Sequence, residues 1–467
     1  MDKYYLAVDI GASSGRHILG SIQNGKINIQ EIHRFDNGIK DVDGSKCWNV
    51  EYLFQEILNG MKKCAGMGIA PESVGIDTWA VDYVLLDEND KILGKTYAYR
   101  DARTADVIGE VYKTIPENQL YGRTGIQKQP FNTIYQLMAD KVSPSLTLNH
   151  VNSLLLIPDF FHYLLSGVKA TEYTNASTTQ LVSPETYDWD FELIEQLGYP
   201  AHIFQKIVEP GTVLGELLPE IQRQVGFNCK VVVPGTHDTA SAVAAVPSME
   251  EHPLYISSGT WSLMGTELLK ADCSEESRQA NMTNEGGYGH RFRYLKNIMG
   301  LWMIQSVRHE YDDKYSFAQL CEMADEAGCS SIVDVNDDRF LAPDSMIDAV
   351  QQYCSETGQQ VPETPGDMAR VIYSSLAKCY GMTVRQLEKI TGIKYKSIHV
   401  EGGGSNAKYL NRLTAKYTGK TVYAGPAEAT AIGNIAVQMI ADNRFAGLKE
   451  ARKCISESFD INVLEVR

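Results

Sequence analysis

The sequence has little of what marks secreted, metal-binding or nucleic-acid-binding chains. Its nine cysteines are scattered and include no C-x-x-C pair, which argues against a disulfide framework or a zinc site and favours reduced thiols in the cytoplasm. No run of 18 apolar residues and no apolar N-terminal signal region is present, so we expect no membrane association. Basic residues number 43 against 59 acidic ones, and this negative charge disfavours a nucleic-acid partner.

Length and composition indicate a folded chain with more than one domain. The chain has 467 residues, of which 43% are hydrophobic and 22% charged. This composition is ordinary, but the length exceeds what one hydrophobic core usually supports. Proline and charge interrupt two apolar runs in VPSMEEHP, residues 246–253, as is typical of a linker. We therefore expect an N-terminal domain over 1–245, a linker over 246–253 and a C-terminal domain over 254–467, and the sequence leaves the oligomeric state open.

The patterns of strands and helices indicate one plan used twice. The run YYLAVDI is followed by RHILGSI and KINIQEIHRF, which Asn24-Gly25 separates, a dipeptide typical of tight hairpins. Apolar residues at helical spacing follow Asn49, a candidate cap, and SVGIDTWAVDYVLLD returns to strand character. Strand-like runs over 252–298, a long amphipathic helix over 368–390 and the run SIHVE repeat this order. The order predicts an α/β chain with two ribonuclease-H-like domains, as in actin- and hexokinase-type ATPases, around a central cleft.

The loop Gly-Ala-Ser-Ser-Gly at 11–15 allows three interpretations. It fits the G-x-S-x-G pattern of a serine hydrolase, but a nucleophile elbow requires a helix after the serine turn, whereas a strand and a hairpin follow here, so Ser13 is a poor nucleophile candidate. Small residues would instead let backbone N–H groups, the Ser13 and Ser14 hydroxyls and Arg16 surround a phosphate, with Mg²⁺ between that phosphate and Asp9. The third interpretation is a plain hairpin entrance in which Asp9 hydrogen-bonds the turn, and the segment alone does not decide.

A second polar cluster follows the apolar strand that starts at Lys230. The segment PGTHDTASA brings His237, Asp238 and Thr239 to the carboxyl end of that strand, where open α/β sheets bind ligands. Phosphoryl transfer to an alcohol needs a carboxylate that orients the hydroxyl and accepts its proton, and Asp238 is the candidate for this role. The alternative is that Asp238 caps the next helix and His237 fills a polar gap in the core.

Two stretches of the C-terminal half have the composition of nucleotide contacts. Ser-Ser-Gly-Thr-Trp at 257–261 repeats the pattern of a strand followed by small residues, and presents Thr260 to a phosphate unless it is an ordinary turn. The glycines of EGGGSN, residues 401–406, would let a flat adenine lie against the backbone at a helix N-terminus.

The run GIDTWAVD at 75–82 alternates like a strand. Alternation places Asp77, Trp79 and Val81 on one face and Thr78, Ala80 and Asp82 on the other. An aromatic ring beside carboxylates suits a sugar, whose C–H face packs on the ring. Trp79 is therefore either a sugar platform or a core residue.

These segments, in this order, resemble the FGGY carbohydrate kinases. The resemblance rests on DIGASSGR, GIDTWAVDYVLLD, PGTHDTASA, YISSGTWSL, NIMGLWMIQ and EGGGSN followed by GPAEATAIGN, and it spans nearly the whole chain. DIGASSGR and THDTASA are similar to the members that act on L-rhamnulose. The resemblance implies ATP-dependent phosphorylation of L-rhamnulose at its 1-hydroxyl, in rhamnose catabolism, with Mg²⁺ accompanying ATP.

The resemblance also implies roles for single residues. Asp238 would be the proton acceptor, and Asp9 the carboxylate on the Mg²⁺ side. The residues at the sugar would be Ala80, His237, Asp238, Thr239 and Asn297. The residues at ATP would be Ala12, Ser13, Ser14, Gly15, Arg16, Thr260, Gln305 and Gly403. Ala80 departs from the family, which usually has glycine there, so the ketose preference depends on this position.

Two rival functions remain open. A nucleotide-driven switch or filament subunit would share the fold and bind ATP without a sugar, although the polar strand end around Asp238 and the Trp79 segment speak against it. Within the kinases, L-fuculose or xylulose is the alternative substrate. For any of these ketoses we expect ATP mainly on the C-terminal half, the sugar mainly on the N-terminal half, and closure that excludes water.

Overall fold

The computed structural model describes residues 3–143 and 148–466, and the chain forms two compact units. Unit 1 comprises Met1–Ala245, Leu268–Tyr294 and Thr430–Ser458, and unit 2 comprises Val246–Glu267, Leu295–Ala429 and Phe459–Arg467. Each unit therefore draws on both halves of the sequence, whereas the domains expected from the sequence are continuous ranges; those ranges stay a prediction. No helix in the described parts of the chain is both long and apolar enough to cross a membrane.

The main sheet of unit 1 has the order β11-β12-β6-β1-β2-β3. Its strands are β1 (Tyr4–Ile10), β2 (Ser14–Gln23), β3 (Lys26–Asp36), β6 (Ser73–Thr78), β11 (Val213–Glu216) and β12 (Lys230–Val232). The first three strands form an antiparallel meander, and β1, β6 and β12 run parallel. The β2–β3 turn has positive φ at both Asn24 (53°) and Gly25 (78°), which confirms the predicted hairpin because this turn type requires such angles.

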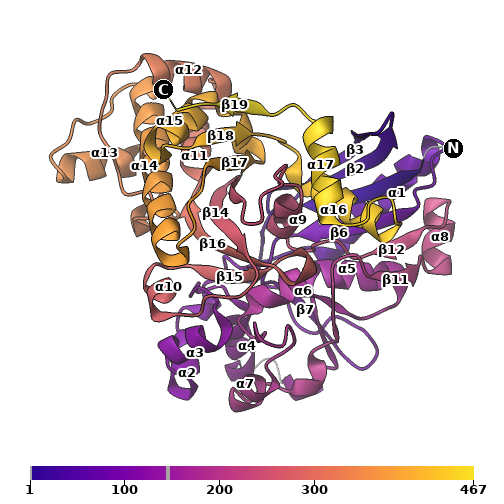
Figure 1. The fold of residues 1–467 in the computed structure, drawn as a ribbon. Helices are drawn as coiled ribbons and strands as arrows, with labels where there is room; N and C mark the ends of the chain where they lie inside the picture. The colour runs from indigo at the N-terminus through magenta and orange to yellow at the C-terminus, as the bar shows by residue number, and fades with distance from the viewer. Residues whose placement is uncertain (1–2, 144–147, 467) are drawn as a thin grey trace. The chain divides into compact units, whose positions relative to one another are not determined.

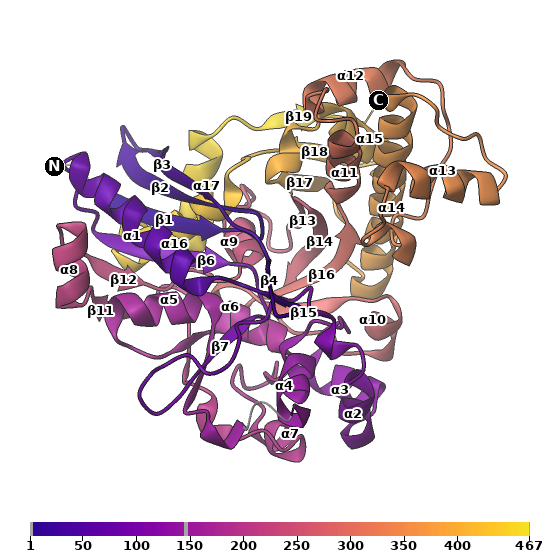
Figure 2. The same ribbon diagram turned by 180° about the vertical axis from the view of Figure 1, so that it is seen from behind.

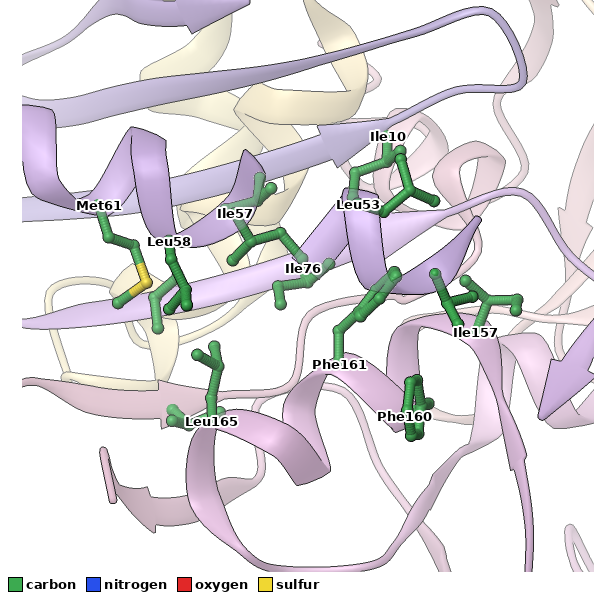
Figure 3. Close-up of a cluster of buried hydrophobic side chains, with 14 of the residues drawn as sticks. Ile10, Leu53, Ile57, Leu58, Met61, Ile76, Ile157, Phe160, Phe161 and Leu165 are labelled. Atoms are coloured by element: carbon green, nitrogen blue, oxygen red, sulfur yellow. The ribbon is translucent and has the colours of Figure 1, made fainter. Parts of the chain in front are cut away.

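Helices cover both faces of this sheet. On one face, α1 (Val50–Gly66) and α5 (Ile157–Ser166) pack through buried side chains such as Leu53 and Phe161 against Ile76 of β6 (Figure 3). The other face carries α9 (Asp238–Ala244), α16 (Ala429–Ala441) and α17 (Leu448–Ser458) (Figure 1). The view from behind shows α1 in front of the sheet, on the opposite face (Figure 2). The Asn49 side chain accepts a hydrogen bond from Tyr52 N, so the predicted cap of α1 is confirmed.

The remainder of unit 1 surrounds a second hydrophobic cluster, which includes Tyr83, Ile134, Leu154 and Trp189. The helices of this part and of the sheet's border are α2 (Ile108–Thr114), α3 (Glu117–Thr124), α4 (Thr133–Val142), α6 (Tyr173–Ala176), α7 (Phe191–Gln196), α8 (Pro219–Val225) and α10 (Glu275–Gln279). The short strands are β4 (Lys40–Val42), β5 (Ser45–Cys47), β7 (Tyr83–Leu86), β8 (Ser153–Leu156), β9 (Thr171–Glu172), β10 (Ile207–Val208) and β15 (Thr283–Gly286).

The predicted strand over residues 73–87 is interrupted, which corrects the predicted alternation. β6 ends at Thr78 and β7 starts at Tyr83, and Val81 between them has φ of 70°. The side chains of Trp79 and Asp82, predicted on opposite faces, contact each other, since Trp79 Nε1 donates to Asp82 Oδ2 at 2.9 Å. The physical reason is the burial of the Asp82 carboxylate, which needs several donors, and a turn lets Trp79 supply one of them.

The sheet of unit 2 repeats the strand order of unit 1. This sheet runs β15-β16-β14-β13-β17-β18-β19, and the six strands from β16 onward repeat that order, with β13–β14 antiparallel and β13, β17 and β18 parallel. They are β13 (Leu254–Ser258), β14 (Trp261–Leu268), β16 (Phe292–Met299), β17 (Ser397–Glu401), β18 (Thr421–Ala424) and β19 (Asn462–Leu464). The helices are α11 (Trp302–Glu310), α12 (Phe317–Glu326), α13 (Met346–Glu356), α14 (Pro365–Thr391) and α15 (Lys408–Thr418). The long helix and the repeated ribonuclease-H-like order are thus confirmed.

Candidate active site

Three aspartates lie at the carboxyl ends of neighbouring parallel strands in unit 1. Asp9 and Asp77 are Cα partners in the β1–β6 pairing, each one residue before the end of its strand. Asp238 follows His237, which forms a parallel bridge with Thr78 at the end of β6. Because ligands of open α/β sheets bind at this edge, the topology brings candidate residues from distant parts of the sequence to one place.

The loop between β1 and β2 is a hairpin turn. Gly11 N donates to Ser14 O at 2.9 Å, and Asn37 N donates to Ser13 O at 3.0 Å. Strand β2 follows directly, so the structure lacks the strand–turn–helix context that a Ser13 nucleophile would need. A Cβ at Gly15 would lie 2.1 Å from Cζ of Phe35, so close packing explains this glycine. The loop leaves the Ser13 side chain exposed.

Arg16 and Asp9 form an ion pair beside this loop. Arg16 Nε and Nη2 lie 2.9 and 2.8 Å from the same oxygen, Asp9 Oδ2. The Asp9 side chain is almost entirely buried, whereas a quarter of the Arg16 side chain (24%) is exposed. The guanidinium is therefore fixed in orientation at the mouth of the loop, where an anion can reach it.

Asp77 is a functional candidate that the sequence did not single out for a role. It is fully buried, and Asn434 Nδ2 of α16 donates to its Oδ2 at 2.6 Å. Burial, and then the nearby Asp9 charge, raise the pKa of Asp77 well above its usual value, which Asn434 opposes. The sequence signal for this contact is weak: Asn434 and Gln438 stand four residues apart in a mostly apolar helix.

Asp238 is the first residue of α9, and His237 occupies the N-cap position. Its Oδ1 accepts hydrogen bonds from Thr239 N at 2.6 Å and from Thr239 Oγ1 at 3.1 Å. About a third of its side chain (34%) is exposed, so the carboxylate is accessible. Burial raises the pKa of Asp238, His237 lowers it, and Asp9 raises it further, with a net upward shift. The arrangement holds a reachable carboxylate of increased basicity at the strand end.

A buried glutamate, which sequence analysis missed, fixes the backbone before Asp238. Glu172 at the end of β9 accepts at Oε2 from Thr236 N (3.0 Å) and from Thr236 Oγ1 (2.7 Å), and at Oε1 from Thr174 N (2.7 Å). Glu172 is fully buried, and burial raises its pKa despite these donors. Nothing in the local sequence around Glu172 indicates that one of its partners, Thr236, lies 64 residues further along the chain.

Trp79 is a core residue. Its ring centroid lies 4.0 Å from that of Trp48, and both indole N–H groups donate to Asp82 Oδ2. Only 7% of Trp79 is exposed, which favours the interpretation of Trp79 as a core residue over that of a sugar platform. Ala80, next to it, is half-buried, and its expected contact with the sugar stays a prediction.

Small residues form the corresponding strand ends of unit 2. Gly259 N donates to Trp261 O at 2.9 Å, and Leu301 N and Trp302 N donate to the carbonyls of Gly259 and Thr260. These bonds join the Thr260 turn to the start of α11, the helix that carries Gln305. Asn297 lies on β16, two residues from its end.

The three glycines after β17 differ in what surrounds them. Gly402 has φ of 75°, and a Cβ at Gly404 would lie 1.9 Å from Ser258 Oγ. A Cβ at Gly403 would meet nothing within 4 Å. The fold therefore requires Gly402 and Gly404, whereas Gly403 leaves space in which a ligand can approach the backbone.

Comparisons with known proteins agree with this geometry. The model of the N-terminal domain of the FGGY family of carbohydrate kinases matches residues 4–245, and that of the C-terminal domain matches residues 254–441. The chain is 52% identical to a rhamnulokinase of Halalkalibacterium halodurans, over 98% of both chains. It is 49% identical to a rhamnulokinase of Oceanobacillus iheyensis, over 99% of this chain and 98% of the relative.

Solved structures share the fold at low sequence identity. A ligand-bound xylulose kinase from Lactobacillus acidophilus aligns over all of this chain and 94% of its own, with a TM-score of 0.82 and 16% identity. A glycerol kinase from Plasmodium falciparum with ADP aligns over 98% of this chain and 94% of its own, with a TM-score of 0.79 and 12% identity. These likenesses confirm the expected two-domain α/β architecture.

Proposed function

Because this chain belongs to the FGGY family of carbohydrate kinases, we propose that it transfers the γ-phosphoryl group of ATP to the 1-hydroxyl of L-rhamnulose, giving L-rhamnulose 1-phosphate. The name of the relatives that are about half identical over nearly the whole chain supports this substrate. The structural observation that carries the chemistry is Asp238, an accessible carboxylate with a raised pKa at the carboxyl edge of the unit 1 sheet.

Asp238 would act as the general base. It would orient the 1-hydroxyl of the sugar and accept its proton while the hydroxyl oxygen bonds to the γ-phosphorus. The bond from that phosphorus to the β–γ bridging oxygen breaks, and ADP leaves with the electron pair. A group of this kind typically supplies about 10²- to 10⁴-fold in rate, and its backbone is held for this role by the buried Glu172.

For the remaining site residues we propose the roles that the resemblance to the family implies. The β1–β2 hairpin, with its fixed Arg16 guanidinium, has the small residues and donors that suit phosphate binding. The proposed ATP contacts are Ala12, Ser13, Ser14, Gly15, Arg16, Thr260, Gln305 and Gly403. The proposed sugar contacts are Ala80, His237, Asp238, Thr239 and Asn297.

Asp9 is the residue that would hold Mg²⁺. Its neighbour Asp77 has a buried Oδ1 without a hydrogen-bond partner among the described residues, and two adjacent carboxylates form a hard-oxygen donor set that fits this cation. No cluster of three or more histidine, cysteine or acidic ligands occurs within 3–143 and 148–466, so water and phosphate oxygens would complete the coordination. When bound, Mg²⁺ would neutralise phosphate charge that Asp9 otherwise repels.

The experiment measures ADP release from Mg-ATP with L-rhamnulose, L-fuculose, D-xylulose, L-ribulose and glycerol, and without a sugar. We expect strong stimulation by L-rhamnulose. If only a different ketose stimulates ADP release, the proposed kinase activity stands and the proposed substrate is wrong. The half-buried Ala80 would then be the first position to vary. Turnover that is independent of sugar would overturn the proposal.

The free state of all nine cysteines supports the cytoplasm as the location of this reaction.

A further inference from the structure

The backbone between β6 and β7 is strained at Val81. Asp82 N donates to Ala80 O at 3.0 Å, which closes a tight turn around Val81, and Val81 has φ of 70°. A γ-turn with positive φ at its centre is the rare and strained kind. Among the described residues with positive φ, Val81 is the only β-branched one, and a branched side chain is least tolerant of this conformation. Such strain persists only where the surrounding structure enforces it, and it concentrates at functional sites.

The buried carboxylate of Asp82 fixes one end of this turn. Its Oδ2 accepts hydrogen bonds from Trp48 Nε1 at 2.6 Å, from Trp79 Nε1 at 2.9 Å and from Tyr99 N at 3.0 Å. Its Oδ1 accepts from Gln136 Nε2 at 2.8 Å. Burial raises the pKa of Asp82 to about 6, against the effect of these donors, so the carboxylate is ionised at pH 7. A buried charge of this kind requires its donors, and it therefore holds its place among them.

Helix α4 holds the centre of the turn. Thr133, the first residue of α4, donates from Oγ1 to Val81 O at 2.7 Å. Gln136, which donates to Asp82, stands three residues further along the same helix, and both side chains are buried. The helix thus bonds to the carbonyl of Val81 and to the carboxylate of Asp82, and these buried bonds together enforce the strained conformation.

The turn brings Ala80 to the strand ends where Asp238 lies. Thr78, the last residue of β6, donates from N to Thr236 O at 2.9 Å, and Asp238 follows two residues after Thr236. Within residues 73–86, all of which the structure describes, Ala80 alone is not buried. The strained turn therefore exposes one small residue at the edge that carries the candidate base.

We propose that Asp82 and Thr133 are positioning residues, which hold Ala80 through the strained turn in the place where it limits which ketose fits. The proposal rests on the function proposed above, in which Ala80 contacts the sugar. Both residues act through the backbone of the turn and touch no reacting atom. If the turn relaxes to negative φ, Ala80 moves, and the apparent affinity for the ketose falls with the fraction of molecules that keep the turn.

The first test compares Thr133→Val with Thr124→Val by ADP release. Each variant replaces a buried hydroxyl of a unit 1 helix by a methyl group, and Thr124 Oγ1 donates to Leu120 O at 2.9 Å, away from the turn. In Thr133→Val we expect the KM for L-rhamnulose to rise about two- to tenfold, as for the loss of one hydrogen bond, with the KM for ATP unchanged. Thr124→Val should leave both values unchanged. Equal KM values for L-rhamnulose in the two variants would overturn the proposal.

A second test uses rescue, which a purely structural role of Asp82 would not produce. Asp82→Asn replaces one acceptor oxygen by a donor, so we expect the KM for L-rhamnulose to rise at least about tenfold and the preference over L-fuculose to fall. Glycine adopts positive φ without strain, so Val81→Gly added to Asp82→Asn should restore part of the affinity. A further loss of affinity in the double variant would contradict the role of the turn.

The strain itself is measured by thermal melts of Val81→Gly and Val81→Ala, which need no substrate. Glycine usually destabilises a folded chain relative to alanine, but at positive φ the order reverses. Val81→Gly should therefore melt above Val81→Ala, and the opposite order would overturn the inference. Failure of the proposed function is recognised separately, since ADP release by the wild type would then respond to no ketose. If a ketose other than L-rhamnulose stimulates the wild type, the same KM comparisons with that ketose decide the role of the turn.

Discussion

The two sheets share one strand order but place different chemistry at the carboxyl ends of their strands. In unit 1, Asp9 of β1 pairs with Asp77 of β6, and Asp238 lies beside them. At the corresponding pairing in unit 2, Ser257 of β13 stands opposite Glu401 of β17. Both strands thus carry a carboxylate at this pairing in unit 1, whereas in unit 2 a hydroxyl takes the place of one of them.

The difference shows that the shared topology sets the position of a site, whereas the side chains at that position determine its chemistry. Carboxylates suit a cation and a proton, which are the needs of the base and of Mg²⁺. Backbone N–H groups and small residues suit an anion and a flat ring, as at Gly403 with its open surroundings. Substitutions at equivalent positions of the two sheets should therefore affect different properties of the enzyme.

The largest expected effect follows removal of the base in unit 1. Asp238→Asn keeps an oxygen that can accept from Thr239 N but cannot accept the proton of the sugar, so we expect kcat to fall at least about 100-fold with the fold retained. ADP release and a thermal melt measure this. Asp190→Asn, at the N-terminus of α7, is the control and should retain its turnover. Near-normal turnover of Asp238→Asn would exclude it as the base.

An intermediate effect is expected from alanine at two adjacent glycines of unit 2. The Cβ of Gly404→Ala would overlap Ser258 Oγ, and such overpacking costs about 1–3 kcal/mol of unfolding free energy. Gly403→Ala meets open space, so its stability should match the wild type while its KM for ATP rises. Urea unfolding and ATP titrations distinguish the two. Equal stability of both variants would contradict the steric argument, and an unchanged KM in Gly403→Ala would contradict its role at ATP.

The smallest effect concerns the buried charge behind Asp9. The pKa of Asp77 is raised in the folded state, so above about pH 4, the usual value of an aspartate, the unfolded chain loses a proton that the folded chain retains. Stability falls as the pH rises through this window. Asp77→Asn removes that loss and should unfold at a higher urea concentration than the wild type at pH 7, but not near pH 3. Equal gains at both values of pH would rule out the charge as the cause.

Local patterns predicted much of the fold, because the relevant interactions lie within a few residues. The Asn24-Gly25 turn, the Asn49 cap and the long helix α14 were all predicted, and each depends on neighbours along the chain. The interruption between β6 and β7 was not predicted, since alternation alone does not reveal that Asp82 is buried and recruits Trp48 and Trp79 as donors.

For the candidate site, too, some features follow from the local sequence and others only from the tertiary structure. The sequence by itself determined the order of the elements, the small residues of the turns and the acidic strand ends at Asp9 and Asp238, because these follow from periodicity and turn chemistry. Only the tertiary structure decided which buried partners control them. Glu172 and Asn434 come from distant segments, and burial, which makes an unpaired charge or polar group costly, gives them their effect.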